Sequence, residues 1–185
     1  MGATYSFKNF TDLTEQESDE VLQGRNDAEV RRWMTSDRVI APDEHRRFVE
    51  SLKASTTQAY LKVERNGHFV GVYSLTDMHE GSAVGGFWVS AYARQRLLSL
   101  CVVFQSIRYV FETFPVEMIR GYQLKNNSSV AKLNAMLGFG LGETPTDADL
   151  RMNYLKLTRD VWSSRVSSEG RLLKLMETAE SRNEE

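Results

Sequence analysis

Two arginines in a short turn are the clearest chemical feature of this sequence. Arg94 and Arg96 lie in the segment Ala93-Arg94-Gln95-Arg96, which follows the β-prone stretch Val84 to Val89 and precedes apolar residues at helical spacing from Leu97 to Phe114. A helix N-terminus presents free N–H groups and a positive partial charge, so a strand, a cationic turn and a helix can together bind a phosphate. The alternative is an ordinary strand–helix unit whose arginines are solvated.

The strand that leads into this turn contains two adjacent glycines, Gly85 and Gly86. Glycine inside a strand marks either a bulge or a place where another backbone or a ligand comes close. Cys101 lies one turn into the apolar helix and is expected to be a small buried hydrophobic residue.

The composition is that of an ordinary soluble protein with one domain. The chain has 185 residues, 41% hydrophobic and 26% charged, and a formal net charge of −2, which argues against a nucleic-acid partner. A single cysteine excludes an internal disulfide and a multi-cysteine metal site, and we expect no metal. Because we find neither an apolar signal region nor an 18-residue apolar run, we expect no membrane contact and a cytoplasmic location.

The first part of the chain predicts a strand, three helices and a hairpin. A capping box, Thr14-Glu15-Gln16-Glu17, starts the first helix, and Asp27 can cap a second that runs through Trp33 and Met34. A third helix begins at Pro42. Asn66-Gly67 between two β-runs is a strong hairpin signal, so three antiparallel strands are predicted before the central helix.

The part after the central helix predicts a strand at Val116 to Leu124, a helix that ends at Gly138 and a last strand at Met152 to Leu157. The fold class is therefore mixed α and β, with a mostly antiparallel sheet flanked by helices. Residues 163–185 are predicted to be a helical tail. One hypothesis is that its apolar residues pack on a second subunit in a homodimer; these are Leu172, Leu173 and Met176.

This order of elements resembles the GNAT acyltransferases over about Thr4 to Trp162, so residues 1–162 are assigned to that domain. The most specific segments are Arg25 to Met34, Val70 to Asp77 and Asn127 to Phe139. Together they look most like the N-acetyltransferases that act on nucleotide-linked amino sugars in pseudaminic-acid and related pathways.

The resemblance implies that acetyl-CoA enters a sheet that splays open after the central strand. The pantetheine arm would pair with backbone near Phe87, Trp88 and Val89, and Asn127 would also bind it. The diphosphate would lie on the turn and the helix N-terminus, formed by Arg94, Gln95, Arg96, Leu97, Leu98 and Ser99. The family has glycine, then glycine or alanine, where this chain has Leu97 and Ser99.

Acyl transfer to an amine requires a positioned thioester, a donor to its carbonyl oxygen, a base for the amine and stabilisation of the leaving thiolate. The base candidates are Asp77, His79 and Glu80, of which His79 is the best single choice because an imidazole is the side chain best suited to proton transfer near neutral pH. A solvated turn is the alternative for all three. Many family members have a proton-donating tyrosine where this chain has Asn134, which cannot act as an acid, although its amide could hydrogen-bond the sulfur. Tyr122 and Tyr154 are alternative acids.

The acceptor side is predicted at Arg25 and Asn26, which can reach a phosphate or sugar, and at Trp33 and Met34, which can stack on a base. Structural roles are the alternative for these residues. The sequence thus predicts an acetyl-CoA-dependent N-acyltransferase that acetylates a nucleotide-linked amino sugar by direct transfer. Two alternatives remain, a protein or peptide N-terminal acetyltransferase and a non-catalytic GNAT-fold binding protein.

Overall fold

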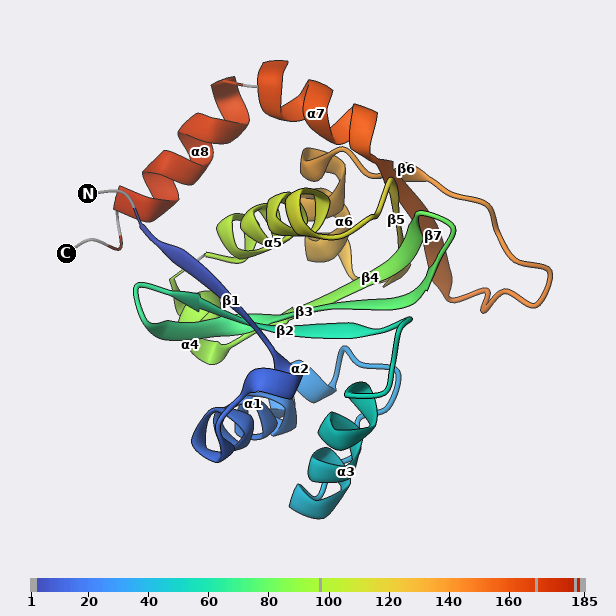
Figure 1. The fold of residues 1–185 in the computed structure, drawn as a ribbon. Helices are drawn as coiled ribbons and strands as arrows, with labels where there is room; N and C mark the ends of the chain where they lie inside the picture. Colours follow the sequence, from blue (N-terminus) through green and yellow to red (C-terminus); the bar gives the residue numbers. More distant parts are fainter. Residues whose placement is uncertain (1–2, 97, 169, 182, 184–185) are drawn as a thin grey trace.

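The chain folds into a seven-stranded sheet with helices on both faces (Figure 1). The structure is a computed structural model, which describes residues 3–96, 98–168, 170–181 and 183. The strand order is β1-β2-β3-β4-β5-β7-β6, in which β4 and β5 are parallel and the other neighbours are antiparallel. The strands are β1 (Tyr5–Asn9), β2 (Ala59–Arg65), β3 (His68–His79), β4 (Ser82–Val89), β5 (Met118–Leu124), β6 (Gly140–Leu141) and β7 (Met152–Thr158).

The helices form one layer on each face of the sheet. Figure 1 shows α1, α2 and α3 on one face and α5, α6, α7 and α8 on the other. Their bounds are α1 (Glu15–Asn26), α2 (Ala28–Arg31), α3 (Pro42–Leu52), α4 (Ala91–Gln95), α5 (Ser99–Thr113), α6 (Ser128–Leu137), α7 (Arg159–Ser168) and α8 (Gly170–Ser181), with a 3-10 turn η1 (Phe10–Asp12). The predicted mixed fold with a mostly antiparallel sheet is confirmed. Among the described residues, none of the helices is long and apolar enough to cross a membrane.

Two local sequence signals have the predicted geometry. Asn66 and Gly67 both have positive φ, 50° and 78°, as the tight turn between β2 and β3 requires. The Thr14 side chain accepts from the Glu17 N–H while the Glu17 carboxylate accepts from the Thr14 N–H, which completes the capping box at the start of α1.

Two hydrophobic cores hold the layers together. The larger one lies between the sheet and α5, α6 and α8, and it includes the fully buried Cys101, as predicted. The smaller one lies under α1 and α3 and is built on Phe10, Val21, Leu52 and Val72. Each helix layer therefore stabilises one face of the strands that carry the candidate site.

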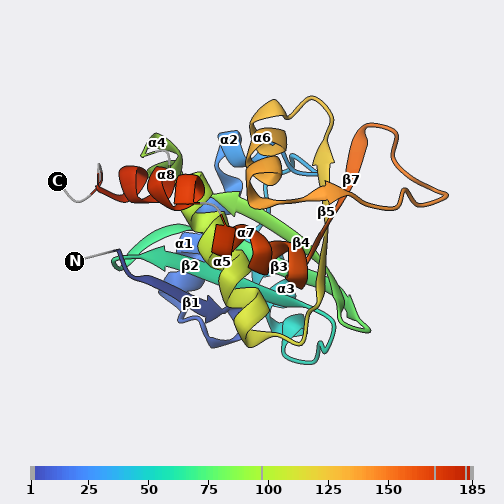
Figure 2. The same cartoon turned by 90° about the horizontal axis from the view of Figure 1, so that it is seen from above.

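The C-terminal helices lie across α5, as Figure 2 shows from above. Met176 of α8 is 6% exposed and belongs to the larger core of its own chain, so it is not available to a second subunit. This corrects one residue of the predicted dimer contact. The side chains of Leu172 and Leu173 lie outside the described residues. Glu180, near the end of α8, accepts hydrogen bonds from Arg65 of β2 and Tyr5 of β1.

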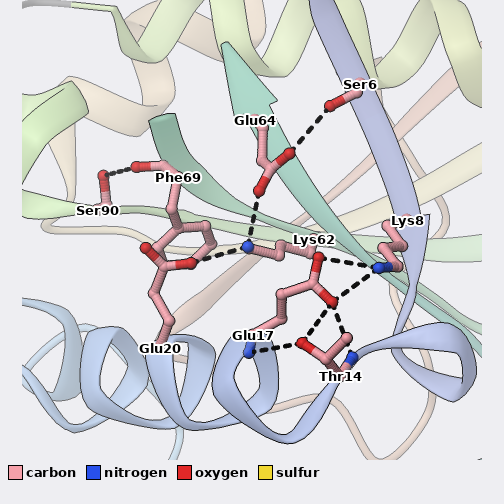
Figure 3. A network of polar contacts seen from close by, with 9 residues as sticks. All are labelled: Ser6, Lys8, Thr14, Glu17, Glu20, Lys62, Glu64, Phe69 and Ser90. Atoms are coloured by element: carbon pink, nitrogen blue, oxygen red, sulfur yellow. Dashed lines mark hydrogen bonds and ion pairs between the residues drawn. The ribbon is translucent and has the colours of Figure 1, made fainter. Parts of the chain in front are cut away.

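A polar network joins α1 to the sheet (Figure 3). Lys62, 2% exposed, pairs with Glu20 at 2.8 Å and with Glu64 at 2.7 Å. Beside it, the Glu17 carboxylate accepts from Lys8 Nζ at 2.7 Å and from the Thr14 N–H at 2.7 Å. These contacts fix α1, whose C-terminal end carries two of the predicted acceptor-binding residues.

Replacing Glu17 by Gln should lower stability by about 1 kcal/mol near neutral pH. The hydrogen bonds from Lys8 and from the Thr14 N–H lower the pKa of Glu17 from 4.5 to about 2. Because the folded-state pKa is depressed, this contribution is complete above pH 4.5 and is lost as the pH falls toward 2. Urea unfolding at several pH values should therefore show that the free energies of unfolding of the native protein and of Glu17→Gln become equal in acid. Glu15→Gln, an exposed acid in the same helical turn, is the control; a Glu17→Gln effect no larger than that of the control would contradict the prediction.

Candidate active site

The central feature of the site is an opening between β4 and β5. The two parallel strands pair only at Ser82, Ala83 and Val84 of β4, opposite Met118, Ile119 and Arg120 of β5. Beyond this segment β4 continues to Val89 and β5 to Leu124 without pairing with each other, while each keeps its other neighbour. The sheet thus splays open after the central strand, as the family resemblance implied.

Backbone groups of β4 face this opening. The Ser90 N–H donates to the Val70 carbonyl oxygen at 3.0 Å, which shows the direction that faces β3. Since backbone groups alternate in direction along an antiparallel ladder, those of Phe87 and Val89 point away from β3 and into the opening. The Val89 carbonyl oxygen accepts from Arg94 Nη1 at 2.8 Å. An extended amide ligand can therefore pair with this strand edge.

The two glycines of β4 do not form a bulge. Leu75 pairs with Gly85 and Ser74 with Gly86 in unbroken register, and the irregularity in the β3–β4 ladder lies between Thr76 and His79. The other possibility, that another group comes close to the glycine backbone, applies to Gly85. A Cβ on Gly85 would lie 2.6 Å from the Tyr73 hydroxyl oxygen, so this position has room only for hydrogen.

The N-terminus of α5 is open, but both arginines beside it have other partners. Its N-cap residue, Leu98, makes no side-chain cap, so the first N–H groups of the helix are available to an anion. Arg94 Nη2 donates to Asp27 Oδ1 at 3.0 Å, and the Arg96 guanidinium lies 3.9 Å from the centroid of the Tyr92 ring. A bound diphosphate would therefore meet the helix N-terminus, with arginine charge nearby.

The remaining residues of the predicted diphosphate turn differ in exposure. Gln95 is exposed and Ser99 is half-buried, whereas the Leu98 side chain is fully buried in the core and can contribute only backbone. Leu97 lies outside the described residues.

Two asparagines of α6 make local hydrogen bonds. Asn127 is the N-cap, and its side-chain oxygen accepts from the Val130 N–H at 3.2 Å. Asn134 is 8% exposed, and its amide donates to Gln123 Oε1 on β5 at 2.7 Å. Both residues lie on the same side of the sheet as α5, where acetyl-CoA is predicted to enter.

The three base candidates lie at the β3–β4 turn, beyond the paired end of β4 and β5. Asp77, which has a positive φ of 50°, forms an ion pair with Arg120 of β5. The side chains of His79 and Glu80 are 76% and 83% exposed, and His79 Nε2 lies 3.5 Å from Glu80 Oε1. The structure places all three at the closed end of the opening, and their catalytic roles stay predictions.

On the opposite face from α5, the C-terminal end of α1 packs against β4. A Cβ on Gly24 would lie 3.0 Å from the Trp88 ring and 2.9 Å from that of Phe69. The next residue, Arg25, is therefore close to the strand that borders the opening. Asn26 donates to and accepts from the Ile40 backbone at 2.9 and 2.8 Å, a structural role.

Arg25 has an incompletely satisfied guanidinium. Its Nη2 donates to the Ser36 carbonyl at 3.4 Å, but its Nη1 is buried and without a partner among the described residues. Burial, followed by repulsion from Arg31 and Arg38, lowers the pKa of Arg25. A site with several cations and an unused donor favours an anionic ligand.

The predicted stacking residues are not in the core. The helix expected through Trp33 and Met34 ends earlier, at Arg31. Trp33 is 40% exposed with the Arg32 guanidinium 5.3 Å from its ring centroid, and Met34 is half-buried. The alternative of a simple core role is therefore wrong for Trp33.

The sequence did not single out Tyr73 or Arg120. The alternation of β3 predicts that Tyr73 is buried, but only the pairing of β3 with β4 brings its hydroxyl to Gly85. Among the described residues, no group of three or more His, Cys, Asp or Glu side chains could hold a metal ion.

Comparison with known proteins agrees with this geometry. Residues 9–140 match the family described as acetyltransferase (GNAT) domain. A protein named acetyltransferase PseH, from Campylobacter jejuni, is 27% identical over 128 residues, which are 68% of this chain and 78% of that protein.

The match to two solved structures of the same fold extends over nearly the whole of each solved chain. The crystal structure of Campylobacter jejuni N-acetyltransferase PseH has a TM-score of 0.67 and 22% identity, covering 84% of this chain and 98% of that one. Spermidine N-acetyltransferase from Vibrio cholerae, solved with CoA and spermine, has a TM-score of 0.74 and 11% identity, covering 86% and 98%. The chain therefore belongs to the GNAT family of acetyltransferases, in which acetyl-CoA is the co-substrate.

Proposed function

We propose that this acetyltransferase acetylates the amine of a nucleotide-linked amino sugar. The observation that carries the proposal is Arg25, whose Nη1 is a buried donor without a described partner, near Arg31 and Arg38. Arg38 pairs with Glu44, whereas Arg25 has no carboxylate partner among the described residues, and a nucleotide diphosphate would supply acceptor oxygens and negative charge to it. The exposed Trp33 ring, a few residues along the same segment, offers a surface for the base.

The two faces of the sheet suit two substrates. Acetyl-CoA would approach from the side of α5 and α6, with its diphosphate at the N-terminus of α5 and its pantetheine arm along Phe87 and Val89. The acceptor would approach from the side of α1, where Gly24 packs on Trp88. The amine and the thioester would then meet at the opening between β4 and β5, as direct transfer within a ternary complex requires.

The reaction needs few groups from the protein. The neutral amine attacks the thioester carbonyl carbon, and a β4 backbone N–H that faces the opening stabilises the developing oxyanion. His79 is the preferred base, with Asp77 and Glu80 as alternatives. Because His79 is largely exposed and lies at the closed end of the opening, a water molecule would relay the proton.

Replacing Arg25 by Gln should raise KM for a nucleotide-linked amino sugar about 10- to 100-fold, the effect of losing a charge-assisted hydrogen bond. KM for an amino sugar without the nucleotide should not change. The assay is thiol release from acetyl-CoA with a panel of nucleotide-linked sugars, free sugars, peptides and polyamines. Arg46→Gln is the matched control, because Arg46 is an exposed arginine that pairs with Asp43 on α3.

Isothermal titration with acetyl-CoA precedes that panel and should show micromolar binding. Thiol release with peptides but not with amino sugars would overturn the proposed acceptor in favour of N-terminal acetylation. An equal effect of Arg25→Gln on acceptors with and without the nucleotide would show that Arg25 does not bind the phosphates.

A further inference from the structure

Tyr73 places a phenol hydroxyl against the backbone of the central strand. The residue lies on β3 opposite Phe87 of β4, is 2% exposed, and belongs to the larger core on the α5 side. Its hydroxyl oxygen would be 2.6 Å from a Cβ on Gly85, and Ile119 Cγ2 would be 2.7 Å from the same atom. The phenol therefore extends along the sheet to Gly85, where only a glycine allows it to fit.

Gly85 marks the vertex of the opening. The last paired residues of β4 and β5 are Val84 and Arg120, so Gly85 is the first β4 residue without a β5 partner. Gly121 follows Arg120 on β5 and is buried, with room for a Cβ at ordinary distance from Phe139. Two glycines thus stand at the point where the strands part, with the Tyr73 hydroxyl beside one of them.

This hydroxyl still has its proton to donate. The Tyr73 side chain as a whole is 2% exposed, and its hydroxyl makes no hydrogen bond to another residue that the structure describes. Burial alone raises the pKa of Tyr73, so the phenol is neutral across the physiological range. A neutral donor with no acceptor among the described residues is suited to a substrate atom that gains negative charge during the reaction.

The residue at the family's usual proton-donor position is already engaged. Asn134 donates an amide N–H to Gln123 Oε1 at 2.7 Å, so this donor is turned toward β5 and not toward a ligand. The Tyr73 hydroxyl is a donor on the α5 side that lies at the vertex of the opening.

We propose that Tyr73 is a catalytic residue whose hydroxyl donates a hydrogen bond to the thioester sulfur as the C–S bond breaks. This inference deepens the acetyl transfer of the proposed function and rests on it. The amine nitrogen forms the new N–C bond, the C–S electron pair goes to sulfur, and the proton lost by the nitrogen ends on sulfur to give the free thiol. Tyr73 stabilises the thiolate until that proton arrives and regains its original state.

The test is Tyr73→Phe, which removes only the hydroxyl and should leave the fold and the melting temperature intact. We expect kcat to fall about 10- to 100-fold, with KM for acetyl-CoA little changed. The second readout needs no acceptor. The pKa of the thiol of bound CoA, followed by the ultraviolet absorbance of the thiolate, should be lower in the native protein than in the variant by about one unit, a tenfold difference in thiolate fraction. Tyr60→Phe, a half-buried tyrosine in the other core, is the control and should change neither quantity.

The outcomes separate this inference from the function on which it rests. An equal thiol pKa in both proteins overturns the role of Tyr73, whether or not kcat falls, because a purely structural residue would not act on the sulfur. Acetyl transfer would then stand without it. If native protein binds neither CoA nor acetyl-CoA by calorimetry, acetyl transfer itself fails, and the role of Tyr73 with it.

Discussion

Replacing Glu180 by Ala is expected to lower the free energy of unfolding by about 3–5 kcal/mol. The Arg65 side chain is 1% exposed, its Nε donates to Glu180 Oε2 at 2.6 Å, and its Nη2 lies 2.5 Å from the same oxygen in an ion pair. The Tyr5 hydroxyl donates to the other carboxylate oxygen at 2.6 Å. Without the Glu180 carboxylate a buried guanidinium keeps its charge and loses its counter-ion, which is a costly way to break a buried pair. Thermal unfolding should show a decrease in Tm of about 6–20 °C.

A matched control and a double variant make this expectation specific. Glu177→Ala removes an exposed acid from the same helix and should have little effect. Arg65→Met combined with Glu180→Leu removes both charges and should recover much of the loss. Equal stability of Glu180→Ala and Glu177→Ala would show that the contacts of Glu180 on α8 contribute little to the stability of the fold. The expected result makes α8 part of the fold. The chain just after α8 also reaches the candidate site, since Asn183 donates to the Arg96 carbonyl at 3.3 Å.

The parts of the fold that follow from short-range chemistry could be predicted from the sequence. The turn at Asn66 and Gly67 depends on two positive φ angles, and the start of α1 depends on Thr14 and Glu17, three residues apart. These signals lie within a few residues of their effect, so no tertiary contact is needed to interpret them. The periodicity of α5 similarly predicted which of its faces is buried.

Contacts between distant segments could not be predicted in the same way. Arg65 and Glu180 are 115 residues apart, and Arg94 and Asp27 are 67 apart, so their pairing depends on how the layers assemble. Arg94 illustrates the consequence for the site. Its residue type and its position before a helix favour phosphate binding. In the assembled fold, however, the Asp27 carboxylate lies within reach, and the guanidinium forms an ion pair with it.

Gly85 shows the same limit for backbone geometry. Its sequence context allowed a bulge or a close approach, and the choice depends on Tyr73, which reaches it from the neighbouring strand. Trp33 illustrates the reverse case, because a helical pattern favoured burial but α2 ends at Arg31 and leaves the ring 40% exposed. In both cases the missing information was a neighbour or a boundary, which local spacing does not specify.

Replacing Gly85 by Ala is expected to reduce kcat/KM about 100-fold, because displacements near 1 Å at the reacting centre have effects of this size. The new Cβ would be 2.6 Å from the Tyr73 hydroxyl oxygen and 2.7 Å from Ile119 Cγ2, distances at which atoms must move. Either β4 shifts into the opening or the Tyr73 phenol moves away from Gly85. Each change disturbs the predicted position of the thioester. Overpacking of this kind should also cost about 1–3 kcal/mol of stability.

The control for this variant is Gly140→Ala, since nothing lies within 4 Å of a Cβ at Gly140 and neither stability nor turnover should change. Combining Gly85→Ala with Tyr73→Phe removes one of the two clashing atoms, so stability should partly recover while turnover stays low. That divergence is the informative result, because a purely structural Tyr73 would restore turnover together with stability. Steady-state kinetics and urea unfolding of the three proteins measure both quantities, and native turnover by Gly85→Ala would mean that the acetyl group is not held at this vertex.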